Sequence, residues 1–412
     1  MRTRRAPIYY GWILLATLSV TEPVSWGVLY YAITVFFKPM ESELGWSRAE
    51  MTGAFSLSLL IAGIAAVPVG RLLDRHGPRW IMTAGSIGAT LLVIAWSRVH
   101  TLTGFYLIWA GIGLASAAVL YEPAFVVVAN WFARHRSRAL TVLTFGGGWA
   151  SVVFIPLSAW LVSADGWRTA LLVLAVIVGV TTIPLHALIL RRHPADLGLE
   201  VDGEVHEKGL PFGASRRVWT GVPIDSALRH ASFWWMSIGF FLILLANVAT
   251  TVHFIPLLTE RGFSSGFAAL AAGMIGLMAL PGRLLFTPLG GRIDRRLVTA
   301  LIFGLQALSM LVLVQAHSKT MVWLFVILFG AGFGAITPAR ASLVADLYGP
   351  RDYGAISGVL ALFTTAARAG ARRRERPARP DRGLSHGRDH LLHTFSRRGR
   401  RHSLRSPLSV RH

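Results

Sequence analysis

Arg283 is a charged side chain inside a long apolar stretch, and its type and position suggest anion binding. The residues one helical turn away on either side are Ala279 and Thr287, so its own helix supplies no acidic partner. A guanidinium without such a partner can bind a carboxylate through two parallel hydrogen bonds. We interpret Arg283 as a substrate contact; the alternative is a structural partner for an acid on another helix. Arg368, in the last apolar stretch, is a second candidate cation for the same cavity.

Glu22 and Glu122 are acids inside apolar stretches of the N-terminal half. A carboxyl group buried among apolar residues could take up a proton and carry it with the substrate. Each stands beside a proline, Pro23 or Pro123, so each could instead mark a helix break that the cavity solvates. His253 could also titrate near neutral pH, with a hydrogen-bonded packing role as its alternative.

Three uncharged residues, Tyr30, Tyr121 and Asn247, could line the same cavity, with aromatic or core packing as the alternative. Signals for catalysis and metal binding are weak. The chain has no cysteine, which excludes disulfides, iron–sulfur clusters and thiolate zinc sites. It has no P-loop motif, which disfavours ATP-driven pumping. We therefore expect no enzyme activity, no metal and no cofactor.

Long apolar runs must position these residues. The chain is 53% hydrophobic and only 15% charged, with a mean hydropathy of +0.54, which favours an all-α polytopic membrane protein. Runs long enough to cross about 30 Å of hydrocarbon lie near 11–37, 50–70, 80–97, 102–128, 139–162, 168–190, 233–257, 266–289, 297–315 and 320–344. An eleventh begins near Tyr353 and loses its apolar character after Ala369. The sequence thus predicts about ten complete helices, a partial eleventh and no twelfth.

Loops rich and poor in arginine alternate between these runs. The rich loops contain Arg2, Arg4 and Arg5; Arg71, Arg75 and Arg79; Arg134, Arg136 and Arg138; Arg191 and Arg192; and Arg292, Arg295 and Arg296. By the positive-inside rule the N-terminus and these loops are cytoplasmic, which predicts a multi-pass protein of the inner membrane. The formal charge of +21 would suggest a nucleic-acid partner in a soluble protein, but its placement in short loops and after residue 370 argues against one.

A polar segment divides the chain. Residues 191–231 are too rich in Gly, Pro and charge to cross a bilayer, so we predict a cytoplasmic linker between a six-helix half, 1–190, and a second half, 232–370. A short pattern recurs at an offset of 220 residues: Pro68, Gly70, Asp74 and Arg75, then Pro288, Gly290, Asp294 and Arg295. Two repeated halves that face each other are typical of transporters with a site near mid-membrane.

The sequence "GRLLDRHGPR" at 70–79 resembles the signature loop of the major facilitator superfamily, although Pro78 stands where a basic residue is usual. The sequences "NWFARHRSRALTVLTFGGGWASVVFIPL", "DGWRTAL", "PADLGLEVDG" and "GWSRAE" are similar to the branch of monocarboxylate transporters and oxalate–formate exchangers. The resemblance covers about residues 1–368. It implies the superfamily's fold of two six-helix halves, transport of an organic anion, and a substrate role for an arginine in the eighth helix, which here is Arg283.

The resemblance also implies a conformational latch at the signature loops. Its members would be Gly70, Asp74, Arg75, Gly77, Arg79, Arg134, Arg138, Gly290, Asp294 and Arg295. Asp74 could accept hydrogen bonds from a helix N-terminus or pair with Arg134 or Arg138. The alternative is that these charges only set the topology.

The chemistry of the chain changes abruptly in its eleventh apolar run. Residues 371–412 contain thirteen arginines against Glu375, Asp381 and Asp389. Such a segment cannot face lipid, and it starts inside a helix rather than at a loop. We interpret it as a non-native tail produced by a shift of reading frame near Ala369. The alternative is a disordered basic C-terminus that binds anionic lipid.

These observations together predict a secondary active transporter. It would move a small organic anion, in the first place a monocarboxylate, by alternating access coupled to proton symport or anion exchange. We expect a monomer in the lipid bilayer whose partners are the substrate and a proton or counter-anion. The alternatives are a truncated remnant that transports nothing and a carrier of a different small solute.

Overall fold

The computed structural model describes residues 8–203, 221–289 and 293–372, without the side chains of residues 287–289 and 366–372. Every regular element in these ranges is helical. The N-terminal helices are α1 (Tyr10–Trp26), α2 (Ile33–Leu44), α3 (Arg48–His76), α4 (Pro78–Ser97), α5 (Leu102–Val119), α6 (Tyr121–Trp131), α7 (Arg136–Gly148) and α8 (Ala150–Ile189), with a π-helical turn, η1, at Gly27–Tyr31. The C-terminal helices are α9 (Ile224–Arg229), α10 (Ala231–Glu260), α11 (Ser265–Leu289), α12 (Arg295–Val314), α13 (Lys319–Tyr348) and α14 (Tyr353–Arg372).

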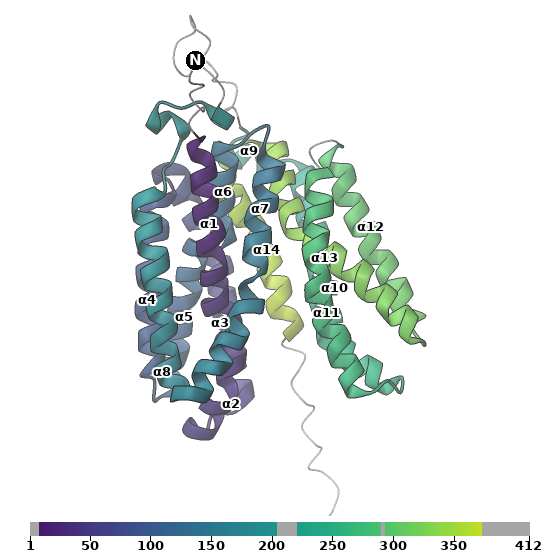
Figure 1. The fold of residues 1–412 in the computed structure, drawn as a ribbon. Coiled ribbons are helices and arrows are strands. Elements are labelled where there is room, and N and C mark those ends of the chain that lie inside the picture. Colours follow the sequence, from purple (N-terminus) through teal and green to yellow (C-terminus); the bar gives the residue numbers. More distant parts are fainter. Residues whose placement is uncertain (1–7, 204–220, 290–292, 373–412) are drawn as a thin grey trace, which may run out of the picture. The chain divides into compact units, whose positions relative to one another are not determined.

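The predicted all-α membrane architecture is confirmed. In the described ranges, nine helical stretches are long and apolar enough to cross a membrane. One of them, Arg136–Ile189, contains both the fifth and the sixth predicted runs. A turn at Gly166, with φ 77°, divides α8 between these two runs. The apolar part of α14, Tyr353–Thr365, is the partial eleventh run. Figure 1 shows the long helices aligned in roughly one direction, as spans of a bilayer must be.

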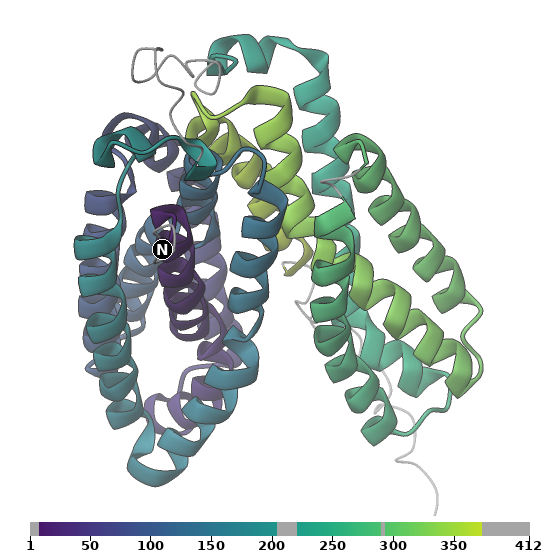
Figure 2. The ribbon, with the colours of Figure 1, turned by 45° about the horizontal axis from the view of Figure 1, so that its top comes forward.

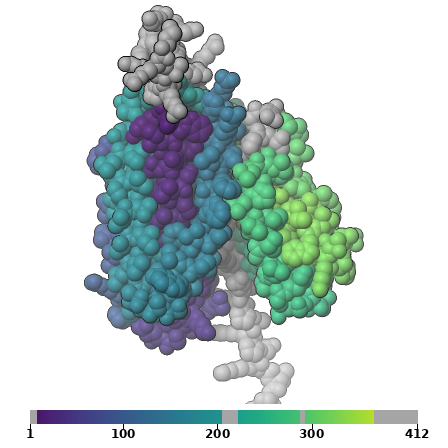
Figure 3. Space-filling view, in the orientation of Figure 1, coloured from purple at the N-terminus to yellow at the C-terminus, as the bar shows by residue number. Residues whose placement is uncertain are grey.

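The helices group by sequence. Figure 2 shows α1 to α8 gathered together and α10 to α13 gathered beside α14. Within the first group α1 packs against α7 and α8, and Figure 3 shows its purple surface between theirs. Between the groups, two short 3-10 turns, Pro194–Leu197 and Val201–Gly203, follow α8. Part of the predicted linker, 204–220, lies outside the described residues, as does the predicted tail from residue 373 onward.

Helix irregularities occur where the sequence places its membrane acids. Pro23 lies in α1 one turn before the π-helical residues Gly27–Tyr31, and a proline removes a backbone donor from the helical ladder. Leu120 has extended backbone between α5 and α6, so Glu122 lies in the first turn of α6. Free backbone N–H groups at a helix N-terminus favour a nearby carboxylate. Both acids thus lie beside helix irregularities, and their alternative role as helix breaks that the cavity solvates stays a prediction.

Helices α3 and α14 pack with their backbones almost in contact. A Cβ atom added to Gly70 would meet the carbonyl oxygen of Gly354, and one added to Gly358 would meet the carbonyl oxygen of Ala66. Gly63 lies against Thr365 in the same way. Glycine in a membrane helix permits this close approach because it has no side chain. These contacts bring an N-terminal helix against the last described helix over several turns.

We expect Gly70→Ala to destabilise the packing of α3 on α14 by about 1–3 kcal/mol, because the new methyl group overlaps a backbone carbonyl that cannot move freely. Gly88→Ala in α4 is the matched control: a Cβ at Gly88 meets nothing within 4 Å, and alanine is the better helix former. Denaturant titration of both purified variants measures the difference. Equal stability of the two variants would contradict the close packing at Gly70.

Candidate functional site

Four ionisable side chains inside the helical bundle, Glu22, Glu122, Arg283 and Arg340, are called here the central charge cluster. Glu122 pairs with Arg340, Glu22 lies within electrostatic reach of Glu122, and Tyr121 lies within reach of both Glu22 and Arg283. The arginine-rich face is the set of helix ends at Tyr10, His76, Pro78, Trp131, Arg136, Ile189, Leu289, Arg295, Tyr348 and Tyr353. At a rise of about 1.5 Å per residue, the four residues lie about 9–18 Å along their helices from this face. In a hydrocarbon core about 30 Å thick, that depth is near the middle and nearer to the arginine-rich side.

Glu122 and Arg340 form an ion pair that joins α6 to α13. Nη2 of Arg340 donates to Oε1 of Glu122. Ser357 of α14 donates its hydroxyl to the other carboxylate oxygen, and Nη1 of Arg340 lies 3.5 Å from Oγ1 of Thr364, also in α14. The Arg340 side chain is 10% exposed and that of Glu122 is 21% exposed. The charges are therefore paired where water is scarce, which makes losing either partner costly.

Arg283 reaches across from α11 to α7 and α13. Its Nη1 atom donates to the carbonyl oxygen of Thr144 at 2.5 Å, and its Nε atom lies 3.4 Å from the carbonyl oxygen of Gly334. A Cβ on Gly148 would meet Nη1, so that glycine leaves the guanidinium its space. Within the described ranges Arg283 makes no ion pair with an acidic side chain. These hydrogen-bond partners are main-chain carbonyl oxygens, and no acidic side chain of the described ranges neutralises its charge.

Glu22 is the most deeply buried acid of the cluster, with no exposed surface. Neither carboxylate oxygen has a hydrogen-bond partner at standard geometry among the described residues, and Nε1 of Trp26, one turn on, has none either. Tyr121 lies within electrostatic reach of both Glu22 and Arg283, and its ring centroid is 5.2 Å from that of Trp26. An unpartnered buried carboxyl is more easily kept when it is neutral than when it is charged.

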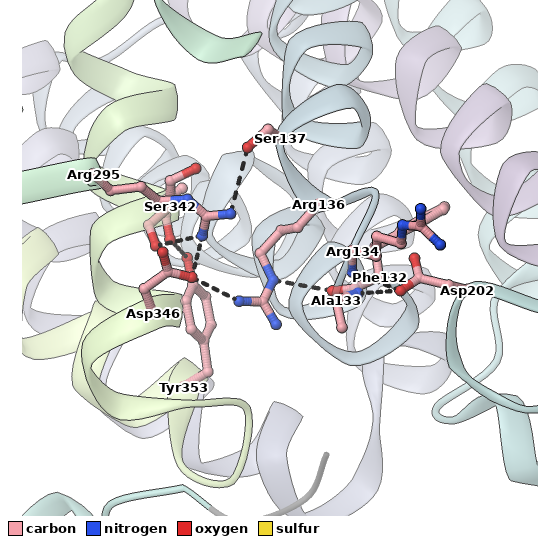
Figure 4. A network of polar contacts seen from close by, with 11 residues as sticks. Phe132, Ala133, Arg134, Arg136, Ser137, Asp202, Arg295, Ser342, Asp346 and Tyr353 are labelled. Carbon is pink, nitrogen blue, oxygen red and sulfur yellow. Dashed lines mark hydrogen bonds and ion pairs between the residues drawn. The ribbon is translucent and has the colours of Figure 1, made fainter. Parts of the chain in front are cut away.

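A second polar network lies nearer to the arginine-rich face than the central charge cluster does (Figure 4). Asp346 of α13 pairs with Arg136 of α7 at 3.2 Å and with Arg295 at the start of α12. Arg136 also donates from Nε to the carbonyl oxygen of Phe132. Nη2 of Arg295 lies 3.4 Å from the hydroxyl of Ser137. One aspartate thus joins an N-terminal helix to two C-terminal helices.

Asp74 makes the other contact at this face. Its two carboxylate oxygens accept hydrogen bonds of 2.9 Å from the backbone N–H groups of Gly354 and Ala355, in the first turn of α14. A carboxylate at a helix N-terminus is stabilised by the free N–H groups and by the helix dipole. Asp74 therefore uses the helix terminus, one of its two predicted partners, at the point where Gly70 approaches Gly354.

Comparison with known proteins decides the family. A family model described as "Major Facilitator Superfamily" matches residues 24–371. The chain belongs to the major facilitator superfamily. Within the superfamily, it is 25% identical over 346 residues to the rat protein "Monocarboxylate transporter 13", covering 82% of this chain and 76% of the relative. It is 21% identical to the "Oxalate:formate antiporter" of Oxalobacter formigenes, covering 79% of this chain and 75% of that protein.

Solved structures of superfamily members share the fold. FucP, described as being in the outward conformation, matches with a TM-score of 0.63 at 16% identity, covering 87% of this chain and 91% of that chain. The human organic anion transporter MFSD10 matches with a TM-score of 0.60 at 16% identity, covering 89% and 92% of the two chains. At these identities the likeness extends to the fold alone. The match of the family model confirms the predicted superfamily membership, and with it a multi-pass membrane protein of a transporter family.

The other residues predicted to contact the substrate or carry a proton differ in their burial and partners. The Tyr30 ring packs against Trp26 and Phe55, with centroids 5.3 and 5.4 Å away. Asn247 of α10 is 2% exposed, and its Nδ2 atom has no hydrogen-bond partner in the described part of the chain. His253, two turns later, is exposed. Arg368 lies in α14, but its side chain is outside the described residues. Their substrate and proton roles stay predictions.

The predicted latch residues divide into those that join helices across the chain and those that do not. Asp74 and Arg295 make such contacts, whereas Arg75, Arg134 and Arg138 are exposed. Others make contacts within one half of the chain: Arg79 donates to the carbonyl oxygen of Ala187 in α8, Gly77 turns with φ 79° under the side chain of Arg192, and Asp294 caps α12 through the N–H of Arg296. Gly290 lies outside the described residues.

Three contact residues were missing from the sequence prediction: Arg340, Arg136 and Asp346. Arg340 stands in an apolar stretch just after Pro338 and meets the criterion that selected Arg283. Arg136 could have been separated from Arg134 and Arg138 by helical spacing, because it shares a face of α7 with the buried residues Ala139 and Leu140. Its partner Asp346 is 210 residues away, and no local pattern announces that pairing.

Proposed function

We propose that this protein is a secondary active transporter of a small organic anion, in the first place a monocarboxylate. The observation that carries the proposal is the setting of Arg283: a guanidinium inside the helical bundle that is bonded to the carbonyl oxygens of Thr144 and Gly334 and, among the described residues, to no acid. Arginine is suited to hold a carboxylate because its N–H groups match the two oxygens. The names of the sequence relatives, which are carriers of monocarboxylates and of oxalate and formate, point to the same chemical class.

Proton symport is the coupling that the central charge cluster favours. Glu22 is buried without a hydrogen-bond partner in the described part of the chain, so it is the acid best placed to bind and release a proton. Glu122 already holds Arg340 and Ser357. We assign the proton to Glu22 and a structural pairing to Glu122. Anion exchange without a proton is the second mode of coupling.

The arginine-rich face is the cytoplasmic side of this proposed inner-membrane protein, by the positive-inside rule. Both polar contacts at that face, Asp74 with α14 and Asp346 with Arg136 and Arg295, are made in this structure. We assign them the role of a latch that closes the cytoplasmic side and breaks when the N-terminal and C-terminal helices rock apart. The chain is then in an outward-facing arrangement.

Uptake by proteoliposomes tests the proposal. Labelled acetate, lactate and oxalate are offered to the chain as it stands and to a second version. After Ala369 the second version is translated in the reading frame that encodes the rest of the apolar run. Carboxylate uptake by either version, with an uncharged sugar excluded, supports the anion assignment. Uptake of the sugar with no carboxylate moved would overturn it.

Glu22→Gln should abolish coupling to a pH gradient. With proton symport, one pH unit across the membrane accumulates a monocarboxylate up to about tenfold, since about 1.4 kcal/mol corresponds to a factor of ten. The amide cannot carry a proton, so the variant should fill only to equal concentrations. Glu41→Gln, at an exposed acid of α2, is the matched control. Tenfold accumulation retained by Glu22→Gln would remove Glu22 from the proton path.

A further inference from the structure

A pocket of about 310 Å³ opens beside Asp74, away from the central charge cluster. It is lined by Asp74, Asn130, Arg192, His193, Pro350 and Arg351. These residues come from the end of α3, from α6, from the segment after α8 and from the turn between α13 and α14. Its volume is at the lower end of the range of about 300–1,000 Å³ that is usual for small-molecule sites.

The charge of this pocket is positive. Within the described ranges neither Arg192 nor Arg351 has an ion-pair partner. Both carboxylate oxygens of Asp74 are already taken by the N–H groups of α14. Burial, and then the charge of Arg192, lower the pKa of His193 to about 4, so its ring is neutral at pH 7. The two guanidinium groups therefore set the sign of the site.

Two buried polar atoms of the lining lack partners. Asn130 is 5% exposed, and its Oδ1 atom has no hydrogen bond in the described part of the chain. The Nε atom of Arg192 is also buried and unpaired there, while its Nη2 atom donates to the carbonyl oxygen of Asp74 at 2.5 Å. Buried polar groups normally have partners. An amide and a guanidinium that lack them in a pocket are groups that a polar ligand can satisfy.

We propose that this pocket binds a small oxyanion, a carboxylate or phosphate group, and that the bound anion holds the latch closed. Arg192 and Arg351 would donate to the oxyanion, and Oδ1 of Asn130 would accept from a protonated oxygen of the anion or from a hydroxyl beside it. Asn130 lies in α6, Arg192 in the segment after α8 and Arg351 in the turn before α14, so separation of the N-terminal and C-terminal sides dismantles the site. Anion binding thus favours the arrangement in which Asp74 contacts α14. This regulatory consequence rests on the proposed transport cycle, whereas the binding itself does not.

Binding of inorganic phosphate to the purified full chain tests the site. Calorimetry in lipid-free detergent compares sodium phosphate with sodium chloride at equal ionic strength. Saturable binding of phosphate is expected, weakened about tenfold or more by Arg351→Gln, since hydrogen bonds to charged groups are the strong ones, and abolished by the added charge of Asn130→Asp. Arg71→Gln, which removes an exposed arginine of α3 outside the pocket, should bind as the unchanged chain does.

Two further experiments distinguish a lipid headgroup from free phosphate as the ligand, and this pocket from the central charge cluster as the binding site. Nanodiscs of phosphatidylcholine with and without phosphatidylglycerol show whether a lipid headgroup occupies the pocket, because occupancy by the headgroup would weaken phosphate binding to the unchanged chain in the nanodiscs that contain phosphatidylglycerol. Phosphate binding lost in Arg283→Gln but kept in Arg351→Gln would place the anion in the central charge cluster and overturn the proposal. Absence of saturable binding in all media would overturn it as well.

Closure of the latch is measured separately, as a distance between two spin labels. Because the chain has no cysteine, spin labels can be placed at Arg138→Cys and Arg296→Cys, two exposed positions on α7 and α12. Phosphate should narrow the distance distribution towards the shorter, closed population, and Arg351→Gln should remove this response. Phosphate that binds without changing the distribution would refute the regulatory part and leave the site. Failure of carboxylate uptake would affect neither binding result.

Discussion

Arg340→Gln is expected to destabilise the protein by about 3 kcal/mol, because it leaves the Glu122 carboxylate partly buried and uncompensated. The Arg340 guanidinium is 10% exposed and is bonded to Glu122 and Thr364. Its loss therefore removes one polar contact of α13 with α6 and one with α14. Denaturant titration of the purified chain measures the change, with an unchanged slope showing that the two-state description still applies.

A double-mutant cycle separates the pair from its surroundings. Glu122→Gln together with Arg340→Gln should recover part of the lost stability, because no charge is then left without a partner. Arg138→Gln is the matched control: it removes an exposed arginine on α7, and such surface changes usually stay within about 0.5 kcal/mol. A cost for Arg340→Gln as small as that of the control would show that the buried pair contributes nothing to folding.

The spans could be predicted because lipid leaves the backbone few options. A helix satisfies its own hydrogen bonds in hydrocarbon, so run length was enough to predict each span, although α2 ends seven residues and α3 six residues beyond the predicted runs. Single residues marked some boundaries: Ser47 caps α3 and exchanges hydrogen bonds with Glu50. The turn at Gly166 fits too, since its φ of 77° suits glycine. These are local rules, and local sequence contains them.

The pairings could not be predicted, because they join residues far apart in the chain. Glu122 and Arg340 are 218 residues apart, and Arg136 and Asp346 are 210 apart. Membrane burial marked Glu122 as unusual, but only the packing of α6 on α13 and α14 gives it its partners. Of the charged loop residues, the structure selects Arg136 because its face of α7 points inward, a matter of helix phase that a list of arginines does not express.

Arg283 shows both sides of this division. Its chemistry could be inferred from the absence of an acid one turn away, because residue type decides what a guanidinium can bind. Its surroundings could not, since the carbonyl oxygens of Thr144 and Gly334 belong to two other helices. The space that it needs at Gly148 is likewise set by how α11 meets α7. The residue type thus indicated anion binding, while three helices determine where the anion would meet it.

Arg283→Lys should lower carboxylate uptake about 10- to 100-fold while the protein still folds. Lysine keeps the positive charge but offers a point charge in place of two parallel donors. Losing one hydrogen bond to a charged group costs about 1.5–3 kcal/mol, which corresponds to that range of affinity. The loss should appear in the substrate concentration for half-maximal uptake, because the interaction removed is one of binding.

Arg261→Lys is the control for this measurement, because Arg261 also bonds main-chain carbonyls. Its Nη1 atom donates to Leu313 and Ala316, but it stands at the end of α10, on the side of the bundle away from the arginine-rich face. A change of arginine geometry alone would weaken both variants equally. A substrate contact predicts that Arg261→Lys transports with unchanged affinity and that Arg283→Met, which has no charge, transports nothing. Wild-type affinity in Arg283→Lys, with Arg283→Met still active, would mean that the carboxylate binds elsewhere.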